Sequence, residues 1–246
     1  MSNVIVITSG KGGTGKTSLT AGVGSCLAAL GKQVLCVDMD VGLRNLDLSL
    51  GLSDRAVMDF TDVLSGRCAL ERAAVSHPAV HGLSLLTAPV TLPRQPLSRA
   101  AMLELLRQAR ERYDFILMDS PAGLGEGFRL ACCGADRAVV VSTTDPAALR
   151  DAQRTVTLLR GSIPRIHLVV NRVQPKLLRQ LHTTIDDAMD TAGLPLLGIV
   201  PEDPQVLLCA NREQPLILHA SRGAATAYLN IARRLLGQRA PLMRIR

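Results

Sequence analysis

Hydrophobic positions along the chain form short runs that alternate with longer amphipathic stretches. The short runs are continuously apolar and rich in β-branched residues, as in Val139–Val141 and Leu168–Val170, which is typical of strands buried on both faces of a sheet. The longer stretches carry apolar residues three or four positions apart, which is typical of helices packed along one face. This alternation predicts an α/β fold: a doubly wound, mainly parallel sheet with helices on both faces.

The elements predicted from this pattern extend over nearly the whole chain. Strands are expected at 3–8, 33–38, 83–87, 114–119, 137–142, 166–171 and 196–200. Helices are expected at 16–30, 98–112, 146–160, 176–192 and 221–236, the last with Ser221 as its N-cap. Because no linker or repeat interrupts the pattern, residues 1–237 are interpreted as a single domain, followed by a short basic tail at 238–246.

Composition narrows the class of protein. The 246 residues are 47% hydrophobic, which is enough for one continuous core and excludes a disordered chain. No apolar run approaches the roughly 18 residues that span a bilayer, and Val4–Ile7 is too short for a secretory signal. The six cysteines include no Cys-x-x-Cys pair and are interpreted as buried apolar residues. These features predict a cytoplasmic protein.

The strongest motif follows the first predicted strand and opens the first predicted helix. Residues 10–17, here called the phosphate loop, read Gly-Lys-Gly-Gly-Thr-Gly-Lys-Thr and match G-x-x-x-x-G-K-[ST]. The glycines let backbone N–H groups point at phosphate oxygens, and the helix N-terminus adds its positive end. We expect Lys16 to reach the β- and γ-phosphates and the Thr17 hydroxyl to bind Mg²⁺. The expected nucleotide contacts here are Gly10, Lys11, Gly12, Gly13, Thr14, Gly15, Lys16, Thr17 and Ser18.

A second lysine in the phosphate loop, Lys11, is unusual. Only four of the 28 basic residues are lysines, and two of these four lie in this loop. Because the loop backbone already surrounds the phosphates, Lys11 cannot easily fold back onto its own nucleotide, but it could reach one held by a second copy of the chain. The alternative is a solvated loop lysine.

With these residues the sequence resembles the deviant Walker A ATPases of the ParA/MinD family, a group of P-loop NTPases in which the first loop lysine acts in trans. Two further segments look like the MinD versions of the family's switches: residues 37–47 (VDMDVGLRNLD), the first switch segment, and 118–123 (MDSPAG), the second. The resemblance continues through 170–172 and 200–203 to 234–237, and therefore covers nearly the whole chain.

Two aspartates at the ends of predicted strands, Asp40 and Asp119, belong to these switch segments. The carboxyl edge of a parallel sheet is where such folds bind ligands, so both are expected to hold Mg²⁺ with Thr17. Asp40 would also orient the attacking water, which makes Lys11, Lys16 and Asp40 the predicted catalytic residues. Capping the next segment is the alternative for either aspartate. Asp38 could share the metal or water role or bond the switch backbone, and the sequence leaves both open.

The resemblance also implies a set of residues around the base. Asn171 would bond the edge of the adenine, with Arg172, Pro201, Glu202 and Asp203 completing the frame. Taken alone, an asparagine at the end of a strand more often structures a turn.

The function implied by the resemblance is an ATP-dependent dimerisation switch that helps to place the cell-division site. It would be a slow, Mg²⁺-dependent ATPase, active as an ATP-bound homodimer and stimulated by MinC-like and MinE-like partners. Two alternatives are a ParA-like DNA-binding partition ATPase and a related regulator of flagellum number. With two Tyr, three Phe and no Trp, the chain offers little for base stacking, and nucleic acid is not expected as a partner.

The net charge of +7 is concentrated at the C-terminal end. From Arg222 onward there are six arginines and no acidic residue, so residues 1–221 carry 22 − 21, or +1. This distribution favours an acidic partner or an anionic membrane contacted by the C-terminus. The tail, with Leu242, Met243 and Ile245 among arginines, would be a weak anchor at the inner face of the cell membrane in the ATP-bound dimer. A tail packed on the body or disordered is the alternative.

Overall fold

The computed structural model describes residues 2–91 and 96–243. It contains an eight-stranded sheet in the order β3-β4-β2-β5-β1-β6-β7-β8, in which only the β3–β4 pair is antiparallel. The mainly parallel sheet predicted from the apolar runs is therefore confirmed. The strands are β1 (Asn3–Thr8), β2 (Val34–Asp38), β3 (Val75–Ser76), β4 (Leu83–Leu86), β5 (Phe115–Asp119), β6 (Arg137–Ser142), β7 (Arg165–Val173) and β8 (Leu196–Pro201).

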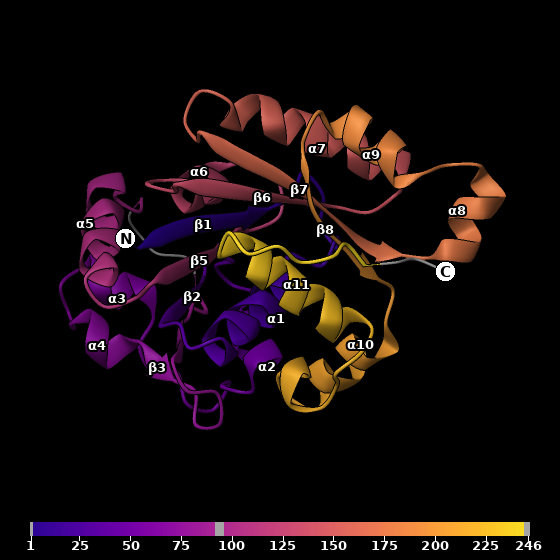
Figure 1. Cartoon of the computed structure of the whole chain (residues 1–246). Coiled ribbons are helices and arrows are strands. Elements are labelled where there is room, and N and C mark those ends of the chain that lie inside the picture. The colour runs from indigo at the N-terminus through magenta and orange to yellow at the C-terminus, as the bar shows by residue number, and fades with distance from the viewer. Residues whose placement is uncertain (1, 92–95, 244–246) are drawn as a thin grey trace.

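Helices cover both faces of the sheet, as the doubly wound prediction requires (Figure 1). One face carries α1 (Lys16–Ala29), α2 (Leu46–Leu50), α10 (Pro204–Asn211), a short 3₁₀ helix (Leu216–Leu218) and α11 (Ala224–Leu235). The other carries α3 (Phe60–Leu64), α4 (Leu70–Ala73), α5 (Arg99–Arg110), α6 (Glu126–Ala131), α7 (Pro146–Leu159) and α9 (Ile185–Ala192), while α8 (Pro175–Leu181) projects beyond the end of the sheet.

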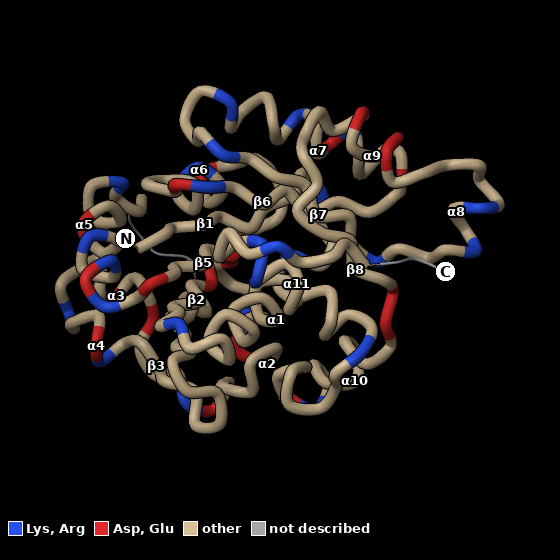
Figure 2. The backbone as a smooth tube through the Cα atoms, viewed as in Figure 1, with Lys and Arg blue, Asp and Glu red and all other residues tan. Residues whose placement is uncertain are grey.

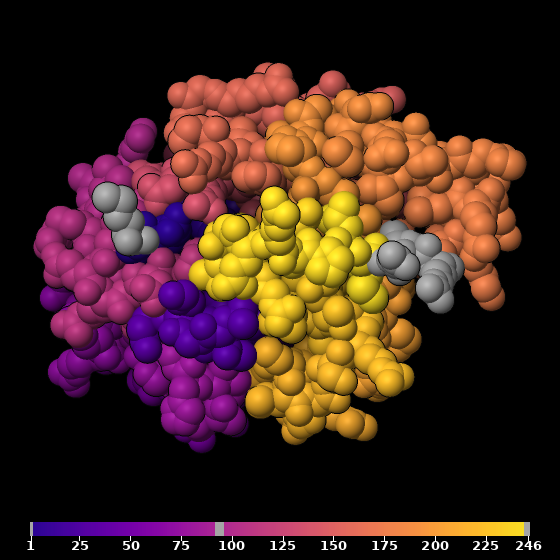
Figure 3. Space-filling model, viewed as in Figure 1, coloured from indigo at the N-terminus to yellow at the C-terminus, as the bar shows by residue number. Residues whose placement is uncertain are grey.

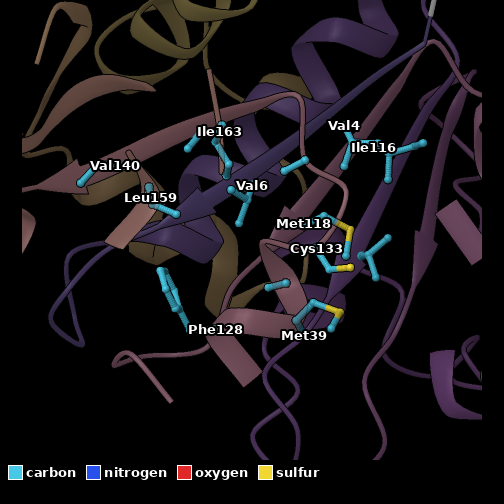
Figure 4. Packing of buried hydrophobic residues seen from close by; sticks show 14 of the residues in the cluster. Val4, Val6, Met39, Ile116, Met118, Phe128, Cys133, Val140, Leu159 and Ile163 are labelled. Atoms are coloured by element: carbon cyan, nitrogen blue, oxygen red, sulfur yellow. The ribbon is translucent and has the colours of Figure 1, made fainter. Parts of the chain in front are cut away.

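Alternate residues along the strands contribute to two separate hydrophobic cores, one on each face of the sheet. Val4 and Val6 of β1 pack with Met118 and Phe128 on the α5–α7 face (Figure 4), whereas Ile5 and Ile7 face α1 and α11. On that second face α1 and α11 lie so close together that a Cβ atom added to Gly22 of α1 would be 2.1 Å from the Tyr228 ring of α11. The C-terminal helix and the N-terminal segments accordingly adjoin on the surface (Figure 3).

Two helix predictions are wrong in detail. The helix expected at 176–192 is two helices, because His182 adopts a φ of 50° and a capping box between Thr184 and Asp187 starts α9. The Ser221 N-cap is also wrong: α11 begins after Gly223, and its first N–H, that of Ala224, donates to the Asp203 carboxylate at 2.9 Å.

The described part of the C-terminal tail lies against the body. Arg234 Nε donates to the Ala240 carbonyl at 3.2 Å, and Met243 packs against the α5–α7 core. Arg244, Ile245 and Arg246, which the tail prediction includes, lie outside the described residues. Within the described ranges, every helix is too short or too polar to span a membrane.

Candidate functional site

The phosphate loop connects β1 to α1 at the carboxyl edge of the sheet. Gly13 and Gly15 have φ angles of 76° and 88°, a region that favours glycine. Gly15 is further restricted by its neighbour, because an added Cβ would lie 2.3 Å from Asn171 Nδ2. That amide nitrogen donates to the Thr14 carbonyl at 2.8 Å. The curl of the loop is therefore fixed by its own glycines and by the end of β7.

Lys16 begins α1 and is buried, with 7% of its surface exposed. Its Nζ donates to the Ser9 hydroxyl at 3.1 Å, and none of the ion pairs among the described residues includes it. Burial lowers the Lys16 pKa, while the charges of Asp119 and Asp40 act in the opposite direction. A buried ammonium at a helix N-terminus, without a carboxylate in contact, fits a polyphosphate ligand.

Asp119 ends β5 beneath the phosphate loop. Its carboxylate is buried and accepts hydrogen bonds from Thr17 Oγ1 at 2.7 Å and Thr20 Oγ1 at 3.1 Å. Burial, and next the charge of neighbouring Asp38, raise the Asp119 pKa to about 7. An adjacent divalent cation would favour the ionised form.

Asp38 ends β2 as the direct register partner of Asp119. It accepts hydrogen bonds from the backbone N–H of Asp40 at 2.9 Å and of Leu46 at 3.1 Å. Of the two roles left open for Asp38, the structure shows the bond to the switch backbone. Burial raises its pKa to about 6.

The residues predicted to hold Mg²⁺ lie around Lys16. Thr17 follows it in the chain, and burial lowers its pKa while the charges of Asp119 and Asp40 both raise it. The Thr17 hydroxyl donates a hydrogen bond directly to Asp119. Burial raises the pKa of half-buried Asp40, while the charge of Lys16 lowers it. Within the described residues, no group of three or more His, Cys, Asp or Glu side chains could hold a metal ion. The Thr17 hydroxyl and the two carboxylates suit magnesium, which usually keeps one or two protein carboxylates and takes its other oxygens from phosphate and water.

A cavity of about 730 Å³ opens above the phosphate loop. Of the predicted nucleotide contacts, Gly10, Lys11 and Thr14 are absent from its lining. The predicted residues that line it are Gly12, Gly13, Gly15, Lys16, Thr17, Ser18, Asp40, Asn171, Arg172, Pro201, Glu202 and Asp203. A neighbouring cavity of about 800 Å³ lies between the two switch segments and shares Asp40 and Ala122 with it.

The predicted base frame is held together by contacts between its own members. Arg172, with a φ of 55°, pairs with Glu202 at 2.8 Å and donates from Nη1 to the Gly13 carbonyl at 3.3 Å. Asp203 caps α10 through the Gln205 N–H at 2.9 Å in addition to capping α11. The Asp203 carboxylate thus anchors two helices, while contact with the base stays a prediction.

Lys11 lies on the rim, outside the cavity lining. Its Nζ pairs with Asp145 Oδ2, at the N-cap of α7, at 3.0 Å, and both side chains are about half exposed, at 48% and 46%. The hydrogen bond from Lys11 is the main cause that lowers the Asp145 pKa. Lys11 therefore bonds a carboxylate outside the cavity lining, and its contact with the nucleotide of a second copy stays a prediction.

Several cavity residues were missed from the sequence. They include Leu43, Asn45, Ser49, Pro204, Val206, Leu207, Ala210 and Tyr228. The short helices α2 and α10 were not predicted, and the contacts of the predicted first switch segment and C-terminal helix with the cavity depend on long-range packing. Asp203-Pro204 is a recognisable helix start that could have located α10. The Ser53 hydroxyl, which follows α2, donates a hydrogen bond to the Glu213 carboxylate, which follows α10. This bond links the segments that follow α2 and α10.

Comparisons with known proteins match this geometry. The model of the CobQ/CobB/MinD/ParA nucleotide binding domain matches residues 5–216. The septum site-determining protein MinD of Synechocystis sp. is 40% identical over 99% of this chain and 92% of its own length. The chain belongs to the MinD family. MinD of Bacillus subtilis is 39% identical over 98% of this chain and 92% of its own length.

Solved structures agree with membership of the MinD family. A MinC:MinD cell division protein complex from Aquifex aeolicus superposes with a TM-score of 0.92 at 38% identity, covering 99% of both chains. MinD from Pyrococcus horikoshii, complexed with Mg-ADP, gives 0.84 at 28% identity over 96% of both. A ParA family ATPase from Chlorobium tepidum gives 0.81 at 21% identity over 95% of this chain and 98% of its own, a likeness of fold alone.

Proposed function

We propose that this chain is a MinD-type ATPase, an ATP-dependent dimerisation switch that helps to place the cell-division site by hydrolysing ATP to ADP and phosphate. The observation that carries this proposal is the contrast between the two loop lysines, one buried beneath the cavity and one exposed on its rim. The Mg-ADP complex of the P. horikoshii relative supports ATP, ADP and Mg²⁺ as the ligands of the same loop.

In this mechanism the chain mainly positions the reacting groups and neutralises the charge of the phosphates. The phosphate-loop N–H groups and Lys16 would hold the β- and γ-phosphates, and Thr17, Asp119 and Asp40 would hold Mg²⁺, which when bound would neutralise the phosphates further. Asp40, which lines both cavities, would orient the attacking water. Because Lys11 is held outside the cavity, a single copy lacks one cation of the complete site, which makes hydrolysis slow.

Dimerisation would complete the site. An exposed ion pair such as Lys11–Asp145 stabilises by only about 0–1 kcal/mol, so Lys11 can exchange it for a buried contact with a partner copy's phosphates. Hydrolysis removes the γ-phosphate and with it much of the negative charge that holds the Lys11 of the second copy.

The partners follow from the family and from the charge distribution. The A. aeolicus relative is solved in a MinC:MinD complex, which supports a MinC-like partner, and a MinE-like activator is proposed with it. The six arginines from Arg222 onward favour contact of the C-terminal end with an anionic membrane when two copies lie side by side. The proposed location is the cytoplasm, with peripheral attachment in the ATP-bound state.

Light scattering with and without Mg-ATP tests the switch. We expect the wild type to become dimeric with ATP, Lys11→Ala to bind ATP but stay monomeric, and Lys16→Ala to lose ATP binding. Lys176→Ala, at an exposed position on α8 outside the cavity lining, is the matched control and should behave as the wild type. Equal behaviour of wild type and Lys11→Ala, whether both monomeric or both dimeric, would contradict the proposal.

A further inference from the structure

A group of basic side chains lies at the amino edge of the sheet, opposite the phosphate loop. Arg137 and Arg165 begin β6 and β7 and are direct register partners. His167 follows two positions after Arg165 and therefore points to the same face, the one that α11 covers. Figure 2 shows basic positions at the starts of both strands and near the end of α11. We call Arg137, Arg165 and His167 the edge cluster.

The positive charges of the edge cluster are poorly compensated. The nearest carboxylate along the chain, Asp136, accepts the Val4 N–H at 2.7 Å and pairs with Arg110 at 2.9 Å. Burial lowers the pKa values of Arg137 and His167, and the charges of the neighbouring arginines lower both further, while Asp136 acts in the opposite direction on Arg137. The register of β6 and β7 places Arg137 and Arg165 side by side. Like charges held together in this way attract an anion.

Two polar atoms of the edge cluster are buried without a partner. Arg137 Nη1 donates to the Leu235 carbonyl at the end of α11, at 3.1 Å. Its Nε, however, and His167 Nδ1 have no hydrogen-bond partner among the residues that the structure describes. Leaving such groups unpaired costs about 1–3 kcal/mol each, so a ligand that accepts hydrogen bonds from both would be favoured.

A polar cavity of about 330 Å³ adjoins Arg137, lined also by Lys32, Asp114 and the end of α11 at Leu235–Gly237. Asp114 accepts the Gln33 N–H at 2.9 Å. Arg234, one position before the part of α11 that lines the cavity, donates from Nη1 to the Leu197 carbonyl of β8 at 3.0 Å. Arg137 is the member of the edge cluster that lines this cavity, whereas Arg165 and His167 are not among its lining residues. The charged lining residues are Lys32, Arg137 and Asp114, so the lining is positive overall and leaves space for a small anion. The cavity is far from the nucleotide because it lies at the opposite ends of the same strands.

We propose that the edge cluster binds a phosphate group. Arginine guanidinium groups bind phosphate oxygens through paired N–H donors, and His167 Nδ1 can supply a further N–H when the proton resides there. Lys32 at the rim adds a mobile ammonium. The phosphate could be a free ion or part of a lipid headgroup, since both present the same oxygens. This site is independent of the ATP switch and does not rest on it.

The test is an NMR titration of the full chain with inorganic phosphate, with the phosphate loop saturated by a non-hydrolysable Mg-ATP analogue. We expect shift changes at the starts of β6 and β7, and about tenfold weaker binding in Arg165→Gln, because one charge-assisted contact is lost. Arg165 is exposed, so this variant should fold even if Arg137→Gln, which loses a helix contact, does not. Arg150→Gln, an exposed arginine on α7, is the matched control.

Sedimentation with phosphatidylglycerol vesicles, against phosphatidylcholine vesicles, separates the two sources of phosphate. Loss of free-phosphate binding in Arg165→Gln supports the site with a soluble ligand. Loss of phosphatidylglycerol binding alone in the same variant supports it with a lipid headgroup. If Arg165→Gln matches the wild type and Arg150→Gln in both measurements, the proposal is overturned.

Discussion

The two lysines of the phosphate loop are five positions apart and have opposite surroundings. Lys16 is 7% exposed and bonds a hydroxyl, whereas the Lys11 side chain is 48% exposed and bonds a carboxylate. The difference follows from position, because one lysine opens a buried helix and the other lies where the loop leaves the sheet. The same residue type can therefore serve as a fixed phosphate ligand and as a movable one.

Replacing Asp145 by Asn should release Lys11 while keeping the α7 cap, since an asparagine oxygen can still accept the Ala147 N–H. We expect ATP-dependent dimerisation to become tighter by up to about fivefold, the strength of an exposed ion pair. Light scattering over a range of protein concentrations measures the change. Asp186→Asn, at an exposed position on α9, is the control, and an unchanged or weaker dimer in Asp145→Asn would contradict the idea of a competing ion pair.

A methyl group at Gly15 should do more harm than one at Gly13. Both glycines have positive φ, but only the Gly15 Cβ would collide with Asn171, whereas nothing lies within 4 Å of a Cβ at Gly13. We expect Gly13→Ala to lose about 1 kcal/mol of unfolding free energy from strain, and Gly15→Ala to lose about 2–3 kcal/mol together with ATP binding. Urea unfolding and ATP titration measure both, and equal losses would show that Asn171 moves aside without cost.

At the scale of elements, long segments were predictable and short ones were not. The apolar runs of β1 and β6 and the periodicity of α5 and α7 carry their own signals. By contrast, α2, α3 and α4 are four or five residues long, below the length at which a helix is stable alone, and depend on packing and on caps such as the Asp59–Asp62 box. The break between α8 and α9 was readable in Thr184-x-x-Asp187, a capping-box pattern inside an otherwise periodic stretch.

The turn between β3 and β4 is tied to α2 by His77. Its Nδ1 accepts the N–H groups of Ala79 and Val80 at 3.1 and 2.9 Å, and its Nε2 donates to the Leu50 carbonyl at 3.0 Å. This arrangement requires the neutral ring, and burial lowers the His77 pKa below its ordinary 6.5. The stability that the neutral ring contributes is therefore complete above about pH 6.5 and declines as the pH falls from there towards the folded-state pKa.

His77→Asn should remove this pH dependence, since an asparagine oxygen can accept the same turn N–H groups without titrating. At pH 7.5 we expect the variant to have about 1–2 kcal/mol less unfolding free energy than the wild type, because the bond to Leu50 is lost. At pH 5.5 this difference should be smaller, because the wild type has by then lost part of the stability that its neutral His77 ring contributes. Asp38 and Asp119, whose pKa values are raised, produce the opposite slope, but equally in both proteins. Urea unfolding at each pH measures the difference; a constant gap would contradict the assignment, and exposed His219→Asn is the control.

At the scale of the whole molecule, the site is assembled from segments distant in sequence. The phosphate loop was predictable because its residues are contiguous and its conformation is dictated by glycine. The contacts from Arg172 to Glu202 and Gly13, and the side of the cavity formed by α10, were not, since they depend on which strands become neighbours. The resemblance to a known family supplied those positions, and the structure supplies the contacts that hold them.

The tail can be removed without removing the fold. Its described contacts include the Arg234 bond to Ala240, the Gln238 N–H bond to the Arg233 carbonyl and the packing of Met243. Because these contacts are few, residues 1–237 should remain folded with about 1–2 kcal/mol less unfolding free energy. We expect this shortened chain to dimerise with ATP but to pellet less with phosphatidylglycerol vesicles than the intact chain. Equal recovery in the vesicle pellet would contradict a membrane role for the tail.

The close packing of Gly22 against Tyr228 has a consequence for the order of events during synthesis. α1 holds two interior glycines, Gly22 and Gly24, so it is a weak helix by itself and is stabilised by the sheet and by α11. α1 is the first helix to leave the ribosome and α11 is the last described helix to do so. A nascent chain therefore carries the complete phosphate-loop sequence long before α11 can pack against α1. Because Tyr228 also lines the cavity, we expect a chain whose synthesis stalls before Tyr228 to bind ATP poorly.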